Sequence, residues 1–438
     1  MRPLLILWLA LLGLLLASPV LAQSQALVLP PITGREGATP IVIVPFAWQS
    51  ASPQDPANDM ASIIRSNLNR SGQFRSLDLD RIVEQPSQLD QVRWDIWKQQ
   101  KQNYLVVGRV LDNPDATQRV EFQLANVLTG EQMLSLALQS RRGEERSVAH
   151  QISDLIYEKI TGIRGAFWTR IAYVTATGLG NNIRYRLVVA DSDGFNPQNI
   201  VQSNEPLMSP AWSPDGRRLA YVSFERGNSA IYIQEIATGA RRLVSSFKGI
   251  NGAPAFSPDG NRLALALSRT GNPEITILDL ATNQFTQLTR NLAIDTEPVW
   301  MPDGRELLFT SDRGGRPQIY RVSADGGDAA RVSFQGDYNA RISVSADGQR
   351  WAMVQGNRNV YRIAVIDRKL NDTARIITDG RLDESPTFAP NGSMILYASR
   401  EGVRGVLYAV SADGRVKQRL AYADGDVREP SWSPFRQR

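Results

Sequence analysis

The stretch Pro210-Ala211-Trp212-Ser213-Pro214-Asp215-Gly216 decides the fold, because altered copies of it recur every 44 residues along the second half of the chain. Its aromatic position is the clearest marker. That position is occupied in turn by Trp212, Phe256, Trp300, Val344, Phe388 and Trp432. A fixed period of about 40 to 50 residues is typical of the four-stranded blades of a β-propeller. The repeat therefore predicts an all-β propeller of six blades.

Each repeat unit contains four short strand patterns separated by turn residues. In the second unit these patterns cover residues 253–257, 262–268, 274–280 and 285–289. Five units are complete and the sixth is split, because the pattern at 170–174 matches the second strand at 218–222 but has no first strand before it. We expect the C-terminal strand 429–434 to supply that strand. The propeller would then span residues 168–438 and be closed by its own two ends, which shields the edge strands.

Residues 40–166 alternate between strand and helix patterns and predict a small α/β domain in front of the propeller. A buried strand is expected at 41–45 and a helix at 58–71, where Gly72 would end the helix. A second helix is expected at 144–161. The predicted fold class is therefore an α/β N-terminal domain followed by a six-bladed β-propeller.

The first 22 residues predict a cleaved secretory signal. They carry one charge, Arg2, then an apolar run and the small-residue sequence Val20-Leu21-Ala22. The alternative is an uncleaved membrane anchor over residues 3–22, which is nearly long enough to span a bilayer. The chain has no cysteine, so disulfides and thiol chemistry are excluded. An exported protein without cysteine fits the bacterial periplasm.

The charge balance argues against nucleic acid as a partner. The formal net charge is +5, and the chain is rich in both signs. The acidic and amide residues of the repeated turns invite a catalytic interpretation, but Asp-Gly is a preferred turn sequence that supplies positive φ. These residues are Asp215, Asp259, Asp303, Asp347 and Asn391. We expect them to form turns and the repeated aromatics to form the core between blades.

The loops before each first strand are the candidate binding site, because in a propeller they converge on the central channel. Unlike the turns, they differ from blade to blade, and acidic side chains predominate. The candidate residues are Met208, Ser209, Asn251, Ala253, Asp295, Thr296, Glu297, Asn339, Arg341, Asp383, Glu384, Arg428 and Glu429. Such a face suits a protein segment or a hard cation such as Ca²⁺, whose ligands the sequence does not identify. The alternative is a solvated rim without a role.

Motifs for catalysis are missing from the sequence. The one histidine, His150, lies off the apolar stripe of its helix and is expected at the surface. A Ser-His-Asp triad and metal sites with several imidazoles are therefore excluded. No nucleophile elbow, phosphate loop or dinucleotide fingerprint is present. We assign no catalytic residue.

Several segments resemble the TolB family, the periplasmic propellers of the Tol-Pal system. Within the propeller they are 206–216, 252–260 and 296–298, and outside it 40–48, 70–74 and 159–167. The likeness covers about residue 36 to the end. The chain departs from the family pattern at Ile250, where a histidine is expected, and at Pro30-Pro31, which interrupts an expected strand.

The resemblance implies partners and a role. The channel face would bind the peptidoglycan-associated lipoprotein Pal through Met208, Ser209, Ala253, Thr296 and Glu297. Residues 23–39 would contact TolA, so that the protein links the envelope layers, maintains the outer membrane and acts during its constriction at cell division. We expect a monomer that reaches the membranes only through partners. It would need no cofactor, although a weak Ca²⁺ site in the channel stays open.

Two functions of different classes remain at this point. One is a non-enzymatic scaffold whose channel face holds a folded partner. The other is a periplasmic propeller enzyme, a lyase or dehydrogenase that uses carboxylates and a cation in the channel. The enzyme would need a nucleophile, a base or a cofactor site, and the sequence shows none.

Overall fold

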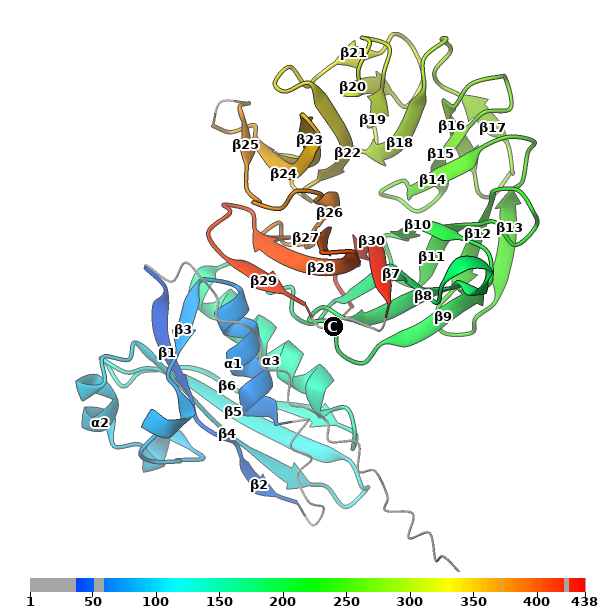
Figure 1. Ribbon diagram of the computed structural model, residues 1–438. Coiled ribbons are helices and arrows are strands. Elements are labelled where there is room, and N and C mark those ends of the chain that lie inside the picture. Colours follow the sequence, from blue (N-terminus) through cyan, green and yellow to red (C-terminus); the bar gives the residue numbers. More distant parts are fainter. Residues whose placement is uncertain (1–36, 51–58, 371, 421–424, 438) are drawn as a thin grey trace, which may run out of the picture.

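The computed structural model describes residues 37–50, 59–370, 372–420 and 425–437 (Figure 1). The expected signal peptide, nearly all of the expected TolA-contacting segment 23–39, and Pro30-Pro31 lie outside these residues. In the part of the chain that is described, no helix is both long and apolar enough to cross a membrane.

The N-terminal domain is a mixed sheet covered by helices. Strands β1 (Thr39–Ile43), β3 (Phe74–Ser76) and β4 (Tyr104–Asp112) run parallel, β2 (Ala47–Gln49) pairs with β4, and β5 (Gln118–Asn126) and β6 (Gln132–Ser140) continue antiparallel. Helices α1 (Met60–Arg70) and α3 (Glu145–Thr161) share one core with the sheet. A second core holds α2 (Trp94–Gln99), and the short 3₁₀ turns of this domain are η2 (Leu79–Arg81) and η3 (Leu89–Gln91). The 3₁₀ turn η4 (Gly180–Asn182) belongs to the second domain.

The ends of the two long helices follow from local chemistry. The Asp59 side chain accepts a hydrogen bond from the Ser62 backbone amide at 3.1 Å, which caps the start of α1. Gly72 and Gly162 follow the two helices with φ of +71° and +73°, the left-handed region that glycine enters at little cost. The helices therefore begin and end within two residues of the predicted bounds.

The described residues of the second domain form six four-stranded antiparallel sheets arranged as a ring (Figure 1). The first three blades are β10 (Leu207–Trp212), β11 (Arg218–Ser223), β12 (Ala230–Glu235) and β13 (Arg241–Ser245); β14 (Asn251–Phe256), β15 (Arg262–Leu267), β16 (Glu274–Asp279) and β17 (Phe285–Gln287); and β18 (Asp295–Trp300), β19 (Glu306–Ser311), β20 (Gln318–Ser323) and β21 (Ala330–Arg331). The predicted fold class is confirmed.

The remaining blades include the one that closes the ring. The fourth and fifth are β22 (Tyr338–Val344), β23 (Arg350–Asn357), β24 (Val360–Asp367) and β25 (Ala374–Ile376); and β26 (Glu384–Phe388), β27 (Met394–Glu401), β28 (Arg404–Ser411) and β29 (Lys417–Arg419). The sixth joins β30 (Asp426–Trp432) to β7 (Arg170–Thr177), β8 (Arg184–Asp191) and β9 (Gln198–Ser203). The C-terminal strand thus starts three residues before the expected one.

The repeated turn residues are structural. Gly216 has φ of +67°, and the Asp215 carboxylate accepts hydrogen bonds from the Ser213 hydroxyl and the Arg217 amide at 2.5 and 3.0 Å. In the next four blades, Asp259, Asp303, Asp347 and Asn391 also accept from the backbone amide two residues on, and the serine hydroxyl bond recurs at Asp259 and Asp347. Their side chains are therefore used to fix the turns.

The repeated aromatic residues pack between blades, as predicted. Trp212, Phe256 and Trp300 are less than a tenth exposed. In the fourth blade Val344 is the exception, and the residue directly opposite on β23 is Trp351, which is 5% exposed. In the other five blades the residue opposite the repeated aromatic is Leu or Ile. In the fourth blade the aromatic ring is therefore on the second strand and not on the first.

The α/β domain lies against the turn side of the ring. The Asn391 side chain, in the turn between β26 and β27, donates to the Arg164 carbonyl at 3.0 Å. The Arg164 guanidinium stacks on Phe435 near the C-terminus. Figure 1 shows the domain beside the blade of β26–β29. The loops predicted to bind a partner are at the other end of the inner strands and are left uncovered by this domain.

Candidate functional site

Six residues in the left-handed backbone region surround the mouth of the channel, one from each inner strand. They are Ser209, Ala253, Glu297, Arg341, Ser385 and Glu429, with φ between +48° and +56°. Each lies where the pairing between the first and second strand of its blade shifts register. With the prolines that follow, they line one hollow of about 170 Å³. The bulge therefore turns one side chain per blade toward the axis.

Arg341 connects Glu297, Glu429 and Ser385, and we call these four residues the channel cluster. Its guanidinium lies 2.9 Å from Glu297 and 3.7 Å from Glu429, and donates to the Ser385 hydroxyl at 2.7 Å. Glu429 also accepts from the Ser209 backbone amide. Burial lowers the pKa of Arg341, but the two carboxylates outweigh it and hold the pKa above its ordinary value. The side chains of Arg341 and Glu297 remain 33% and 23% exposed, so a partner can reach them.

Four candidate residues are not available to a partner. Asn251, Asp295, Asn339 and Asp383 are fully buried, and the prediction that they lie on the binding face is wrong. Each holds the loop before its own strand or the neighbouring hairpin. Asn251 donates to the Phe247 carbonyl at 2.7 Å, and Asp295 accepts from Arg313 at 2.7 Å. Their recurrence at one place in four successive blades is the signal for a structural role.

The other candidates are at the surface or close to it. Met208, Glu384 and Arg428 are exposed, while Ala253 and Thr296 are half-buried. Arg428 pairs with Asp426 of its own strand. These residues, together with the channel cluster, keep their place on the candidate binding face.

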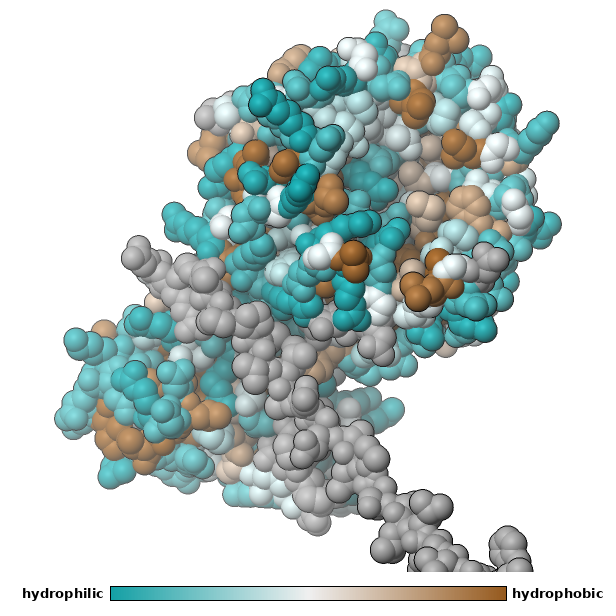
Figure 2. Space-filling view, viewed as in Figure 1, coloured by the Kyte–Doolittle hydropathy of each residue, from teal (hydrophilic) through white to brown (hydrophobic). Residues whose placement is uncertain are grey.

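The face also has an apolar part, which the residues predicted from the repeat pattern do not include. Connections from an outer strand to the next inner strand expose large apolar side chains, namely Ile250 (50%), Leu292 (100%), Ile294 (49%), Phe334 (75%) and Leu382 (38%). Ile250, Ile294 and Leu382 each precede one of the buried Asn or Asp residues, so the 44-residue period could have revealed them. In Figure 2 apolar residues stand in small groups among hydrophilic ones on the visible side of the ring. Apolar anchors among charged groups are typical of protein interfaces.

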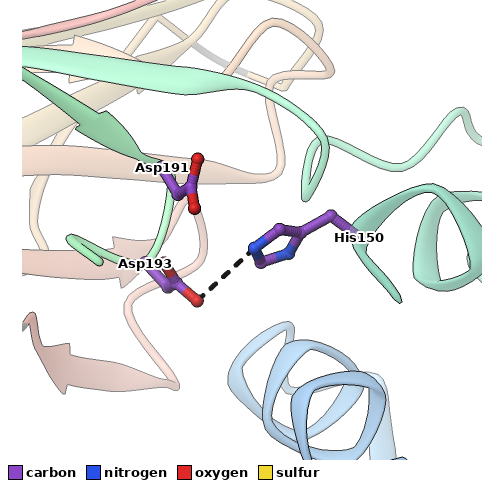
Figure 3. A group of neighbouring side chains, drawn as sticks. All are labelled: His150, Asp191 and Asp193. Carbon is purple, nitrogen blue, oxygen red and sulfur yellow. Dashed lines mark ion pairs between the residues drawn. The ribbon is translucent and has the colours of Figure 1, made fainter. Parts of the chain in front are cut away.

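His150 is buried between the two domains, so the prediction of a surface position is wrong (Figure 3). The Asn67 side-chain amide of α1 donates to His150 Nδ1 at 2.9 Å, which places the proton on Nε2. Nε2 lies 3.6 Å from Asp193, in the loop between β8 and β9. Burial lowers the pKa of His150 to about 3, so the ring stays neutral. Helical periodicity placed the residue off the apolar stripe but could not show that a propeller loop covers that side.

His150, Asp191 and Asp193 belong to a buried ion cluster, the joint cluster, with Arg146 and Arg70. Arg146 lies 2.6 Å from Asp193 and 3.6 Å from Asp191, and Arg70 donates to Ser192 at 2.8 Å. The ligand atoms of His150, Asp191 and Asp193 are within 4.8 Å of one another, a spacing that a metal ion could use. Arg146 already supplies positive charge there, and Arg70 adds more. We therefore assign this cluster to joining the domains.

Fold and site together define a two-domain propeller protein with a built contact face on one side of its ring and an α/β domain fixed to the other. The comparisons with known proteins agree. The family model described as TolB beta propeller domain matches residues 157–436, and the TolB amino-terminal domain matches 32–133.

Relatives and a solved structure extend this result. The Tol-Pal system protein TolB of Xanthomonas euvesicatoria pv. vesicatoria is 64% identical over 431 residues, 98% of each chain, and that of Xanthomonas campestris pv. campestris has the same identity and coverage. The crystal structure of TolB from Acinetobacter baumannii is 40% identical and covers 92% of this chain and 99% of its own, with a TM-score of 0.84. The chain belongs to the TolB family and is a non-enzymatic component of the Tol-Pal system.

Proposed function

We propose that this protein is a periplasmic scaffold that binds Pal through the channel face and TolA through residues 23–39. The observation that carries the proposal is the exposed apolar residues around Arg341 and its two carboxylates, on the side of the ring away from the α/β domain. Membership of the Tol-Pal system supports these partners, and the relatives give no support to the alternative of a propeller enzyme.

The first test measures how Pal binding depends on the charge of the channel face. Calorimetric titration of residues 23–438 with the soluble domain of Pal should give saturable one-to-one binding. Glu297→Lys should weaken it at least about tenfold, because the new ammonium group faces Arg341. Thr296→Ile, one residue away, should weaken it less.

Asp328→Lys is the matched control for Glu297→Lys. Asp328 is exposed in the turn between β20 and β21 of the same blade. This turn is on the turn side of the ring, because its Ala324 donates to the carbonyl of Arg305, in the turn between β18 and β19, at 2.8 Å. The Asp328→Lys substitution makes the same charge change as Glu297→Lys but on the opposite face of the ring, so Pal binding should persist. Equal losses in both variants would contradict the assignment of the face.

Calcium is part of the proposal as a weak ligand of the channel. A cation would compete with Arg341 for the carboxylates of Glu297 and Glu429, so we expect its affinity to be low. The Pal titration is therefore run with and without Ca²⁺. A tight calcium site that is unaffected by Glu297→Lys would place the ion elsewhere.

The TolA contact is tested by deletion of residues 23–35. We expect the shortened protein to bind Pal as before and to lose all binding to TolA. Loss of Pal binding in the same variant would show that the segment contributes to the propeller face as well.

A further inference from the structure

The junction between the third blade (β18–β21) and the fourth (β22–β25) departs from a contact seen between other blades. At three junctions an arginine at the start of the second strand stacks on the repeated aromatic of the next blade. These pairs are Arg170 with Trp212 at 5.1 Å, Arg218 with Phe256 at 5.4 Å and Arg262 with Trp300 at 4.6 Å. The corresponding residues at the third junction are Glu306 and Val344. This junction therefore has neither the arginine nor the aromatic ring that form the contact at the other three.

Among the described residues, the arginine bridge between outer strands is also missing here. Arg242 donates across one junction to the Leu280 carbonyl at 3.5 Å, and Arg375 donates across another to the Ala412 carbonyl at 3.4 Å. The outer-strand arginine of the third blade, Arg331, instead donates to the Ser333 carbonyl two residues along its own chain. The outer edge is joined instead by the Ala374 backbone amide of β25, which donates to the Gln335 side chain, in the connection that follows β21, at 2.8 Å.

A cavity of about 420 Å³ lies at this junction, within the range of small-molecule sites. Its apolar wall includes Trp351, Met353 and Ile366, each no more than 5% exposed as whole residues. Two guanidinium groups lie beside aromatic rings at the cavity. Arg368 is 4.5 Å from the ring of Trp351, and Arg331 is 5.4 Å from that of Phe334.

The charge at this junction pocket is positive. Arg321, Arg331 and Arg368 line it, and Asp372 is the only acidic residue among the described lining residues. Asp372 lies 3.5 Å from Arg368, and Arg321 lies 3.6 Å from Glu306. Arg331 forms no ion pair with any residue that the structure describes. Its guanidinium therefore has the capacity to bind an anion.

We propose that the junction pocket binds a small organic carboxylate that carries a flat or alkyl apolar group. The apolar group contacts Trp351, Met353 and Ile366, and the carboxylate pairs with Arg331, whose planar guanidinium matches its two oxygens. The pocket lies between the second to fourth strands of the two blades, and its lining also includes Phe334 and Gln335 of one channel-face connection, so it adjoins that face. The inference does not depend on the partners proposed above.

The test uses residues 23–438 and two probes, indole-3-acetate and octanoate, titrated by calorimetry and by saturation-transfer NMR. Indole-3-acetamide is the neutral counterpart of the first probe. At least one of the carboxylates should bind saturably, with a Kd of about 1 mM, as expected of ordinary contacts for a ligand of this size. Indole-3-acetamide should bind at least about tenfold more weakly than indole-3-acetate if the latter binds.

Two variants separate the pocket from the rest of the surface. Arg331→Gln should weaken carboxylate binding about tenfold or more, whereas Arg375→Gln, an outer-strand arginine outside the pocket, should leave it unchanged. Thermal unfolding of both variants checks that the ring is intact. The proposal is overturned if neither carboxylate saturates at about 10 mM, if the acetamide binds as well as the acetate, or if Arg331→Gln binds like wild type.

Discussion

The channel cluster and the joint cluster use the same chemistry in different surroundings. In each, one arginine bridges two carboxylates: Arg341 with Glu297 and Glu429, and Arg146 with Asp191 and Asp193. The Arg341 side chain is 33% exposed and that of Arg146 is 16% exposed. Burial of the second cluster between α3 and a propeller loop makes it part of the fold, while the first remains open to a partner. The two clusters therefore differ in exposure and not in residue type.

The largest expected effect is in the joint cluster. Asp193→Asn removes the carboxylate that Arg146, Arg70 and His150 surround, and leaves Arg146 with the more distant Asp191 at 3.6 Å. Loss of one partner from a buried ion pair costs about 3–5 kcal/mol. We expect the free energy of unfolding, measured with urea, to fall by that amount.

Glu429→Gln is the matched change in the channel cluster. It should cost about 1 kcal/mol, since Arg341 keeps Glu297 and is partly hydrated. Equal costs for the two variants would contradict the distinction between the clusters.

The second effect is a pH dependence of stability. The pKa of His150 is about 3 in the folded protein against 6.5 ordinarily, so only the unfolded chain takes up this proton between those values. The stability due to neutral His150 is complete above pH 6.5 and is lost as the pH falls, by about 1.4 kcal/mol per unit. Asp191 acts oppositely: burial raises its pKa to about 6, so the folded state holds a proton more firmly between about pH 6 and 4.

His150→Gln isolates the histidine from Asp191. Between pH 7 and pH 5, wild type should lose about 2 kcal/mol relative to the variant, measured as the difference between their unfolding free energies. Identical pH profiles would show that His150 titrates normally and is not enclosed by the joint.

A smaller effect is expected on the channel face. Leu292 is fully exposed, so Leu292→Asp should change stability by less than about 0.5 kcal/mol. It should weaken Pal binding by about 1–2 kcal/mol, because it places a charge among the apolar anchors. Calorimetry measures the affinity and thermal unfolding the stability.

Leu370→Asp is the control for that change. Leu370 is 79% exposed and lies in the turn between β24 and β25, on the other side of the ring. Its substitution should leave Pal affinity as it is. A similar loss from both variants would mean that binding responds to surface charge in general.

The sequence predicted the ring and its blades because the 44-residue period is imposed by one packing unit repeated six times. It could not predict where side chains at the channel mouth point. The bulge gives Glu297 a positive φ and turns it to the axis, while Asp295, two residues earlier, is buried. Both are acidic residues at the start of β18. The predicted surface position of His150 was wrong for a related reason, because the loop that covers this residue is distant in sequence.

Hydrogen exchange of residues 23–438 with and without the soluble domain of Pal tests the central claim most directly. We predict that Pal slows exchange in the channel-face loops, at 207–209, 250–253, 291–297, 334–341, 382–385 and 427–429. Exchange in the joint loop 191–195 should be slow in both states. Protection by Pal on the turn side with none in the channel-face loops would contradict the account.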